Sequence, residues 1–131
     1  MVLTADQVKA QALRFIKAVQ QRVRVDQALL FGSYAYGQPH AGSDIDLAIV
    51  SQDFAGMNRL TRLQLLEKVA WVADTHDIEA AGFTNDELQS AGKTNVLSEI
   101  RDKGMIIYTS IPEFALRDDR STYSSRKDQD Q

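Results

Sequence analysis

Two aspartates separated by one residue, Asp44 and Asp46, carry the clearest chemical potential in this sequence. The run 44–50, Asp-Ile-Asp-Leu-Ala-Ile-Val, has the apolar and β-branched content that favours a β-strand. Residues two apart on a strand point to the same face, so both carboxylates could bind a hard cation such as Mg²⁺. Taken alone, the pattern fits two solvated acids at a strand edge better than a metal site, because motifs this short arise by chance.

A glycine-serine pair, Gly32-Ser33, follows the preceding apolar run 28–31. A glycine at a strand end lets backbone N–H groups and a serine hydroxyl approach an anion with no Cβ in the way, so the pair could bind a phosphate. The ten residues 34–43, rich in glycine, proline and serine, are predicted to form a loop that leads to Asp44. Two adjacent predicted strands would therefore bring a phosphate cradle and a cation-binding pair to one site.

The elements that must position these residues alternate between helices and strands, which predicts the fold class α/β. Apolar side chains recur every three or four residues in two long segments, the first of which has Thr4 as its predicted N-cap. Trp71 extends the apolar face of the second segment, so Trp71 and the leucines from Leu60 to Leu66 are predicted to lie in the core. The predicted helices cover 6–23, 58–73, a short segment after Thr84, and 95–103, and the predicted strands cover 28–31, 44–50, 76–83 and 105–108.

Length and composition predict one globular domain. A chain of 131 residues is too short for two independent cores, and a content of 44% hydrophobic and 25% charged residues argues against wholesale disorder. We expect a domain over residues 1–116 and a polar, flexible tail over 117–131, which has too few apolar side chains to offset its ordering entropy.

Charge and cysteine content narrow the functional classes. The net charge of −3 gives no basic surplus, so direct binding of nucleic acid is not expected. The absence of cysteine excludes disulfides and thiolate zinc sites and fits a cytoplasmic protein. No apolar run approaches the ~18 residues needed to cross a bilayer, so no membrane association is expected.

The Phe-Gly-Ser at 31–33 and the Asp-Ile-Asp-Leu at 44–47 resemble the signature of the DNA-polymerase-β-like nucleotidyltransferases. That signature is an apolar residue, glycine, and glycine or serine, followed by two acids that alternate with apolar residues. Gly37 and Ser43 bring the match closer to the minimal nucleotidyltransferase branch of this superfamily. The resemblance follows the order of elements along most of the chain and is specific over 29–50.

The resemblance implies a polymerase-β-like nucleotidyltransferase fold, a small mixed β-sheet flanked by helices. It also implies binding of a nucleoside triphosphate, ATP as donor, together with Mg²⁺, with two ions during catalysis. In the family the glycine-serine pair holds the triphosphate, which assigns nucleotide binding to Gly32 and Ser33. Ser43, which belongs to the match with the minimal branch, is also assigned to nucleotide binding. The two catalytic aspartates bind metal, which assigns Asp44 and Asp46, and AMP is transferred to a hydroxyl group.

A third carboxylate on a later strand activates the acceptor hydroxyl in that family. Here Glu79 is the first candidate, as a catalytic and metal-binding residue, because the segment 78–83, Ile-Glu-Ala-Ala-Gly-Phe, is similar to Ile-Glu-Pro-His-Pro-Phe in some members. The segment departs from that pattern at Ala80 and Ala81, and Asp77 is the second candidate for the catalytic acid.

Three functions are considered, of which two are enzymes with different acceptors and the third belongs to another class. Minimal nucleotidyltransferases commonly pair with a helical HEPN protein in toxin–antitoxin systems, so the chain would be the antitoxin and would modify a tyrosine of its partner in a hetero-oligomer. The acceptor could instead be a small molecule of the aminoglycoside kind, and a homodimer would then complete its pocket. The third alternative is a catalytically idle module that binds a nucleotide or a protein.

Other polar residues near the motif are expected to have no role in binding or catalysis. His40, at the tip of the loop, is expected to be solvated rather than to contact a phosphate. Tyr34 and Tyr36 could stack on a base, but packing against the strands is the expected role. Gly-Lys-Thr at 92–94 is similar to the end of a P-loop, but the first glycine of that motif would have to stand at Glu87.

Overall fold

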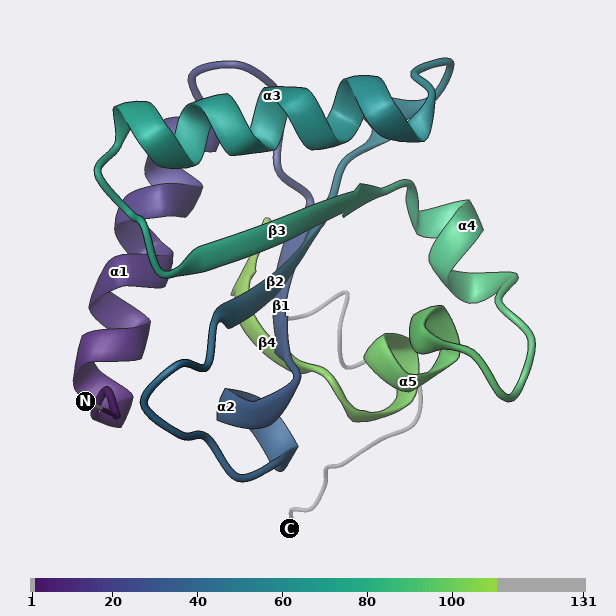
Figure 1. The fold of residues 1–131 in the computed structure, drawn as a ribbon. Coiled ribbons are helices and arrows are strands. Elements are labelled where there is room, and N and C mark those ends of the chain that lie inside the picture. The colour runs from purple at the N-terminus through teal and green to yellow at the C-terminus, as the bar shows by residue number, and fades with distance from the viewer. Residues whose placement is uncertain (1, 111–131) are drawn as a thin grey trace, which may run out of the picture.

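A four-stranded mixed β-sheet forms the centre of residues 2–110, the part of the chain that the computed structural model describes (Figure 1). The strand order is β3-β2-β1-β4, in which β1 pairs antiparallel with both β2 and β4, and β2 pairs parallel with β3. The predicted tail over 117–131 lies outside the described residues. The strands are β1 (Gln27–Phe31), β2 (Ile45–Val50), β3 (Ile78–Phe83) and β4 (Met105–Thr109).

Helices cover both faces of this sheet, which is the architecture predicted from the sequence. The larger core cluster joins one sheet face to α1 and α3, and a smaller cluster joins the other face to α4 and α5 (Figure 1). None of the helices within residues 2–110 has the length and apolar content needed to span a bilayer. The helices are α1 (Ala5–Val19), α2 (Ser33–Tyr36), the 3₁₀ turn η1 (Gln52–Phe54), α3 (Arg59–Val72), α4 (Asn85–Gln89) and α5 (Val96–Lys103).

Capping residues set the starts of the helices. The Thr4 hydroxyl accepts the N–H of Gln7, and the Gln7 side chain accepts the N–H of Thr4, so the predicted cap of α1 is confirmed. The predicted cap of α4 is confirmed in the same way, through Thr84 and Glu87. Helix α1 ends at Val19, earlier than the predicted 6–23, and the N–H groups of Gln21 and Arg22 then donate to carbonyls three residues back, as in a tighter turn.

The predicted loop over 34–43 begins instead with the helical turn α2. The N–H groups of Ala35 and Tyr36 both donate to the Gly32 carbonyl, at 3.0 and 3.1 Å. Apolar periodicity cannot reveal a four-residue helix, since a single turn offers no repeat to recognise.

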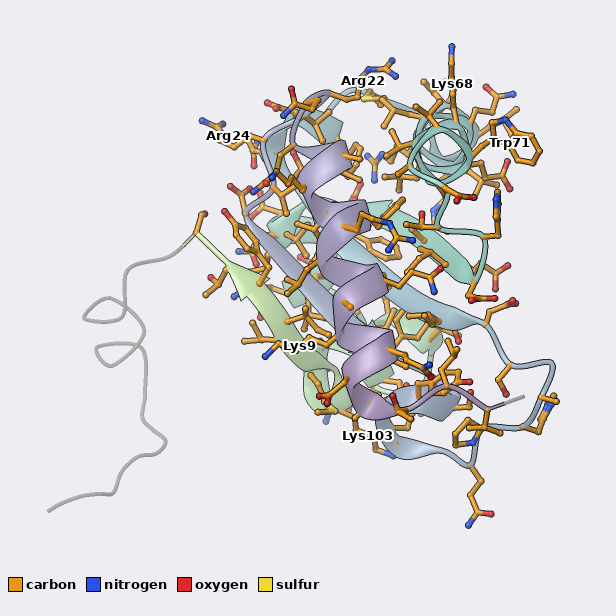
Figure 2. All side chains as sticks on the ribbon, turned by 90° about the vertical axis from the view of Figure 1, so that its left-hand side faces the viewer. Lys9, Arg22, Arg24, Lys68, Trp71 and Lys103 are labelled. Carbon is orange, nitrogen blue, oxygen red and sulfur yellow. The ribbon has the colours of Figure 1, made fainter. Side chains whose placement is uncertain are left out.

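The prediction that Trp71 and the leucine stripe lie in the core is wrong for most of these residues. The buried face of α3 is formed by Arg62, Leu66 and Val69, and Trp71 is 75% exposed on the outer side of the helix (Figure 2). Apolar patterning missed this face because one of its buried positions is an arginine. The exposed apolar residues of this helix are Leu60, Leu63, Trp71 and Val72.

Arg62 is buried because every part of its guanidinium has a partner. It binds both carboxylate oxygens of Glu87, at 2.7 and 3.0 Å, and donates to the carbonyls of Met57 and Gly82 at 2.9 and 3.2 Å. A buried guanidinium is tolerated only when it is paired and hydrogen-bonded in this way. These bonds fasten α3 and α4 to the end of β3.

Candidate active site

The turn between β1 and α2 brings the glycine-serine pair against the first acidic strand. Phe31, the last residue of β1, lies opposite Asp46 in the antiparallel register with β2. Gly32 follows with φ at 75°, a left-handed conformation that residues with a side chain rarely adopt. A Cβ at Gly32 would also collide with Oδ2 of Asp46, so both the backbone and the available space require glycine. The structure therefore makes the predicted phosphate cradle and the predicted cation-binding pair neighbours.

The start of α2 presents N–H groups that an anion can bind. The N–H groups of Ser33 and Tyr34 belong to the first turn, where a helix provides no acceptor of its own. The Ser33 residue is half-buried beside them. Backbone donors of this kind, combined with a hydroxyl and reached through a glycine turn, are suited to phosphate oxygens.

Three acidic side chains gather where β2 and β3 begin. Asp46 lies opposite Glu79 in the parallel register of these strands, and Asp44 precedes β2 by one residue. Alternation along the strands puts Asp46 and Glu79 on the same side of the sheet as Val50 and Phe83, which pack in the cluster covered by α4 and α5. Asp44 and Glu79 are exposed and Asp46 is half-buried, so these acids are open to solvent.

Repulsion among these carboxylates changes the ionisation of Asp46. Its pKa is raised to about 6, first by burial, then by the charges of Glu79 and Asp44, and last by a hydrogen bond with Glu79. A divalent cation bound between the carboxylates would remove the repulsion and favour their ionised forms. A bound cation would therefore stabilise the ionised form of this group of carboxylates.

The carboxylate oxygens of this group suit a Mg²⁺ ion that is bound together with a substrate, rather than a metal ion whose ligands all come from the protein. Within residues 2–110, no three His, Asp or Glu side chains are arranged to hold a metal ion by themselves. Mg²⁺ characteristically binds through one or two carboxylates, keeps several waters and takes phosphate oxygens from the substrate. Asp46 and Glu79 provide two such carboxylates, and Asp44 is a third nearby acid.

The structure separates the two candidates for the third carboxylate. Because β3 begins at Ile78, Asp77 precedes the strand and does not share the face of Glu79. The Asp77 carboxylate accepts from Nε2 of Gln11 at 3.0 Å, and its N–H donates to Oε1 of Gln11 at 3.0 Å. Gln11 lies on α1, which covers the opposite face of the sheet. Glu79 therefore lies in the acidic group, and Asp77 is fastened to α1.

The loop between α2 and β2 is organised by its own side chains. Gly37 begins it: the N–H of Gly37 donates to the Ser33 carbonyl at 3.2 Å, and a Cβ there would lie 2.9 Å from the Ser33 Cα. The Ser43 hydroxyl accepts from the N–H of His40 at 2.9 Å, and Nδ1 of His40 accepts from the N–H of Gly42 at 3.1 Å. Ser43, predicted to bind the nucleotide, thus has its hydroxyl engaged in the loop. His40 is exposed, as predicted, and its ring also accepts a hydrogen bond within the loop.

Helix α5 contributes side chains that no motif indicated. The Tyr36 hydroxyl donates to Oε1 of Glu99 at 2.8 Å, and the Lys103 ammonium lies 5.9 Å from the centroid of the Tyr36 ring. Tyr36 therefore joins α2 to α5 instead of packing on the strands, whereas Tyr34 packs against the core as predicted. Glu99 and Lys103 share a helix face that the sequence could suggest, but the sequence does not say which strand end that face approaches.

Comparison with known proteins gives the family. A family model described as polymerase beta, nucleotidyltransferase, matches residues 14–112. No curated protein sequence matches the chain significantly. A crystal structure from Sulfolobus solfataricus assigned to the nucleotidyltransferases is 15% identical, with a TM-score of 0.60 over 79% of this chain and 81% of that one. At this identity the likeness supports the fold alone.

Two further crystal structures come from toxin–antitoxin complexes. One contains AMP-PNP and is 27% identical, with a TM-score of 0.53 over 75% of this chain and 73% of that chain. The other is an MntA–HpeT complex carrying two Asp-to-Glu substitutions, 25% identical, with a TM-score of 0.52 over 75% and 73% of the two chains. The fold and the family resemblance predicted from the sequence are thereby confirmed.

Proposed function

The chain belongs to the polymerase β-type nucleotidyltransferase family, and we propose that it transfers AMP from ATP to a hydroxyl group of a partner protein in a Mg²⁺-dependent reaction. In this proposal it acts as the antitoxin of a HEPN-containing toxin–antitoxin pair. The observation that carries the proposal is the contact of Gly32 with Asp46, which puts a phosphate-binding turn directly against the acidic group.

Each residue of the site has a distinct role in this reaction. Gly32 and Ser33 bind the triphosphate through the start of α2, and Ser43 holds the loop that leads into β2. Asp44, Asp46 and Glu79 hold Mg²⁺, which supplies charge neutralisation and orients the phosphates. The acceptor hydroxyl oxygen bonds to the α-phosphorus, the bond from that phosphorus to the bridging oxygen breaks, and pyrophosphate leaves.

The proton of the acceptor hydroxyl passes to Glu79. Asp77 is a poorer base for this step, because its carboxylate already accepts a hydrogen bond from Gln11 on the far side of the sheet. Catalysis then depends on positioning and charge stabilisation, without a covalent intermediate on the protein.

Two observations support adenine as the base and a protein as the acceptor. A toxin–antitoxin structure similar to this chain holds AMP-PNP. The chain is also similar to structures of MntA–HpeT complexes, in which a nucleotidyltransferase-type fold accompanies a second protein. The proposal that the partner is of HEPN type and that the acceptor is a tyrosine comes from the family resemblance of residues 29–50.

The test is a transfer assay with the purified chain, ATP, Mg²⁺ and a HEPN-type protein as the acceptor. Mass spectrometry of the partner should detect one or more adenylyl groups on tyrosine with the wild type and none with Asp46→Asn. Parallel reactions with aminoglycosides should give no adenylylated product. Unmodified partner together with an adenylylated antibiotic would replace the proposed acceptor, and MgATP binding without any transfer would indicate an idle module.

A further inference from the structure

Lys103 is a cation to which the proposed reaction gives no role. It is the last residue of α5, and its ammonium lies over the Tyr36 ring at a distance typical of a cation–π contact. Tyr36 in turn donates its hydroxyl hydrogen to Glu99, one turn earlier on α5. Helices α2 and α5 lie near each other below the sheet in Figure 1. Lys103 is thereby held against the helix that begins at Ser33.

The Lys103 ammonium is available to a ligand. Within the described part of the chain it forms no ion pair. The neighbouring Asp102 carboxylate is bound twice by Arg101, at 2.9 and 3.2 Å, and Glu99 already accepts the tyrosine hydroxyl. Because the lysine side chain is also exposed, it can turn toward a bound anion without giving up an ion pair.

A bound triphosphate would need such a cation here. Residues 33–36, Ser-Tyr-Ala-Tyr, contain no basic side chain, so α2 offers only backbone and hydroxyl donors. Asp46 and Glu79 lie on the sheet face that α5 covers, and both are acidic. The triphosphate adds further negative charge to this acidic surface, and cations held by the carboxylates offset only part of it.

We propose that Lys103 binds the β- and γ-phosphates of the nucleoside triphosphate and stabilises the departing pyrophosphate, with Tyr36 and Glu99 as its positioning residues. This proposal rests on the proposed function. As the bond between the α-phosphorus and the bridging oxygen breaks, its electron pair stays on pyrophosphate. Lys103 remains protonated throughout and donates hydrogen bonds to the oxygens on which this charge develops.

Calorimetry on the intact chain tests the proposal with MgATP, Mg-pyrophosphate and AMP. Lys103→Met keeps the aliphatic stem against Tyr36 and removes the charge. We expect it to weaken MgATP and Mg-pyrophosphate about ten- to a hundredfold and to leave AMP affinity unchanged, because a charged hydrogen-bond partner is lost only at the outer phosphates. Lys103→Arg should restore most of the MgATP affinity.

Lys68→Met is the matched control. Lys68 is an exposed lysine of α3, at the opposite end of the molecule from Lys103 (Figure 2), and its loss should not change any of the three affinities. The positioning role of Tyr36 predicts that Tyr36→Phe raises KM for ATP more than it lowers kcat. A loss of folding alone would not give that split.

The outcomes separate this proposal from the proposed function. The assignment of Lys103 is wrong if Lys103→Met binds MgATP as tightly as the wild type. It is also wrong if the variant loses affinity for AMP and MgATP equally while circular dichroism shows an intact fold. In both cases the proposed function stands. If the wild type itself binds no MgATP, the proposed function fails and the role of Lys103 fails with it.

Discussion

Carboxylates have opposite surroundings at the two ends of β3: other acids at its start, and an arginine at its other end. At its start, Glu79 lies beside Asp46, and the pKa of Asp46 is raised to about 6 by burial and by its acidic neighbours. At its other end, Glu87 binds the buried Arg62, and the pKa of Glu87 is lowered to about 2, chiefly by its hydrogen bonds with that guanidinium. The start of the strand therefore gathers like charges without a cation among the described side chains, whereas at the other end Arg62 provides the cation that pairs with Glu87.

This difference separates function from stability along one strand. The repulsion at the start of β3 costs folding free energy, and the cation that we propose there would relieve it. The Arg62–Glu87 pair instead fixes the position of α3 and α4 against the strand. Substitutions at the two ends should therefore have opposite signatures, one in activity and the other in stability.

The largest expected effect is at Asp46. Asp46→Asn should lower the rate of adenylyl transfer about a thousandfold, since it removes a cation ligand beside the phosphate-binding turn. The same change should leave the thermal midpoint equal or raise it by a few degrees, because it relieves repulsion with Glu79. A kinetic assay and a thermal melt on one preparation measure the rate and the thermal midpoint. If the variant unfolded, Asp46 would have a role in stability, like Arg62 and Glu87, rather than in catalysis.

The next effect distinguishes Glu79 from Asp77. Glu79→Gln should slow transfer about a hundredfold, because it removes the proposed base for the acceptor hydroxyl. Asp77→Asn is the matched control, and it should change the rate little while weakening the contact with Gln11. Single-turnover kinetics with saturating MgATP would measure both rates, and a larger loss with Asp77→Asn would reverse the assignment.

At the other end of the strand the effect should fall on stability. Arg62→Met should lower the free energy of unfolding by about 2 kcal/mol, because Glu87 and two backbone carbonyls lose their donor. Arg59→Met on the same helix removes only a cation–π contact with Phe83 and should cost about 0.5 kcal/mol. Urea denaturation measures both values, and equal values would mean that the buried ion pair adds nothing.

The last effect is a pH dependence that comes from Glu87. Its folded pKa lies below its ordinary value of 4.5, so its contribution is fully present above about pH 4.5 and is lost as the pH falls toward 2. The wild type should therefore exceed Glu87→Gln in stability by about 1 kcal/mol near neutral pH, after allowance for solvent screening, and this difference should shrink below pH 4.5. Denaturation of both proteins across this range measures the difference; if it stayed constant, Glu87 would have no titrating role.

The sequence predicted those parts of the molecule that rest on local patterns. Residues 29–50 predicted the glycine turn and the acidic strand, because alternation along a strand follows from spacing, and the resemblance placed the two side by side. The caps at Thr4 and Thr84 were also predicted correctly, since each depends on a residue three positions away.

What the sequence missed depends on tertiary contacts. The exposure of Trp71 follows from the burial of Arg62, and that burial is possible only because Glu87 lies on another helix. The choice between Asp77 and Glu79 depended on where β3 begins and on Gln11, which is far away in the chain. The contact of Tyr36 with α5 likewise joins segments that no short motif connects.

In the proposed reaction, the turn at Gly32 and Ser33 and the acids Asp44, Asp46 and Glu79 form one site for a metal-bound triphosphate. A crystal structure with Mn²⁺ and a non-hydrolysable ATP analogue tests it most directly, because the anomalous signal locates the metal. We expect Mn²⁺ at Asp46 with at least one of Asp44 and Glu79, and phosphate oxygens at the start of α2. Metal or triphosphate bound away from these carboxylates, with the turn at Gly32 empty, would contradict it.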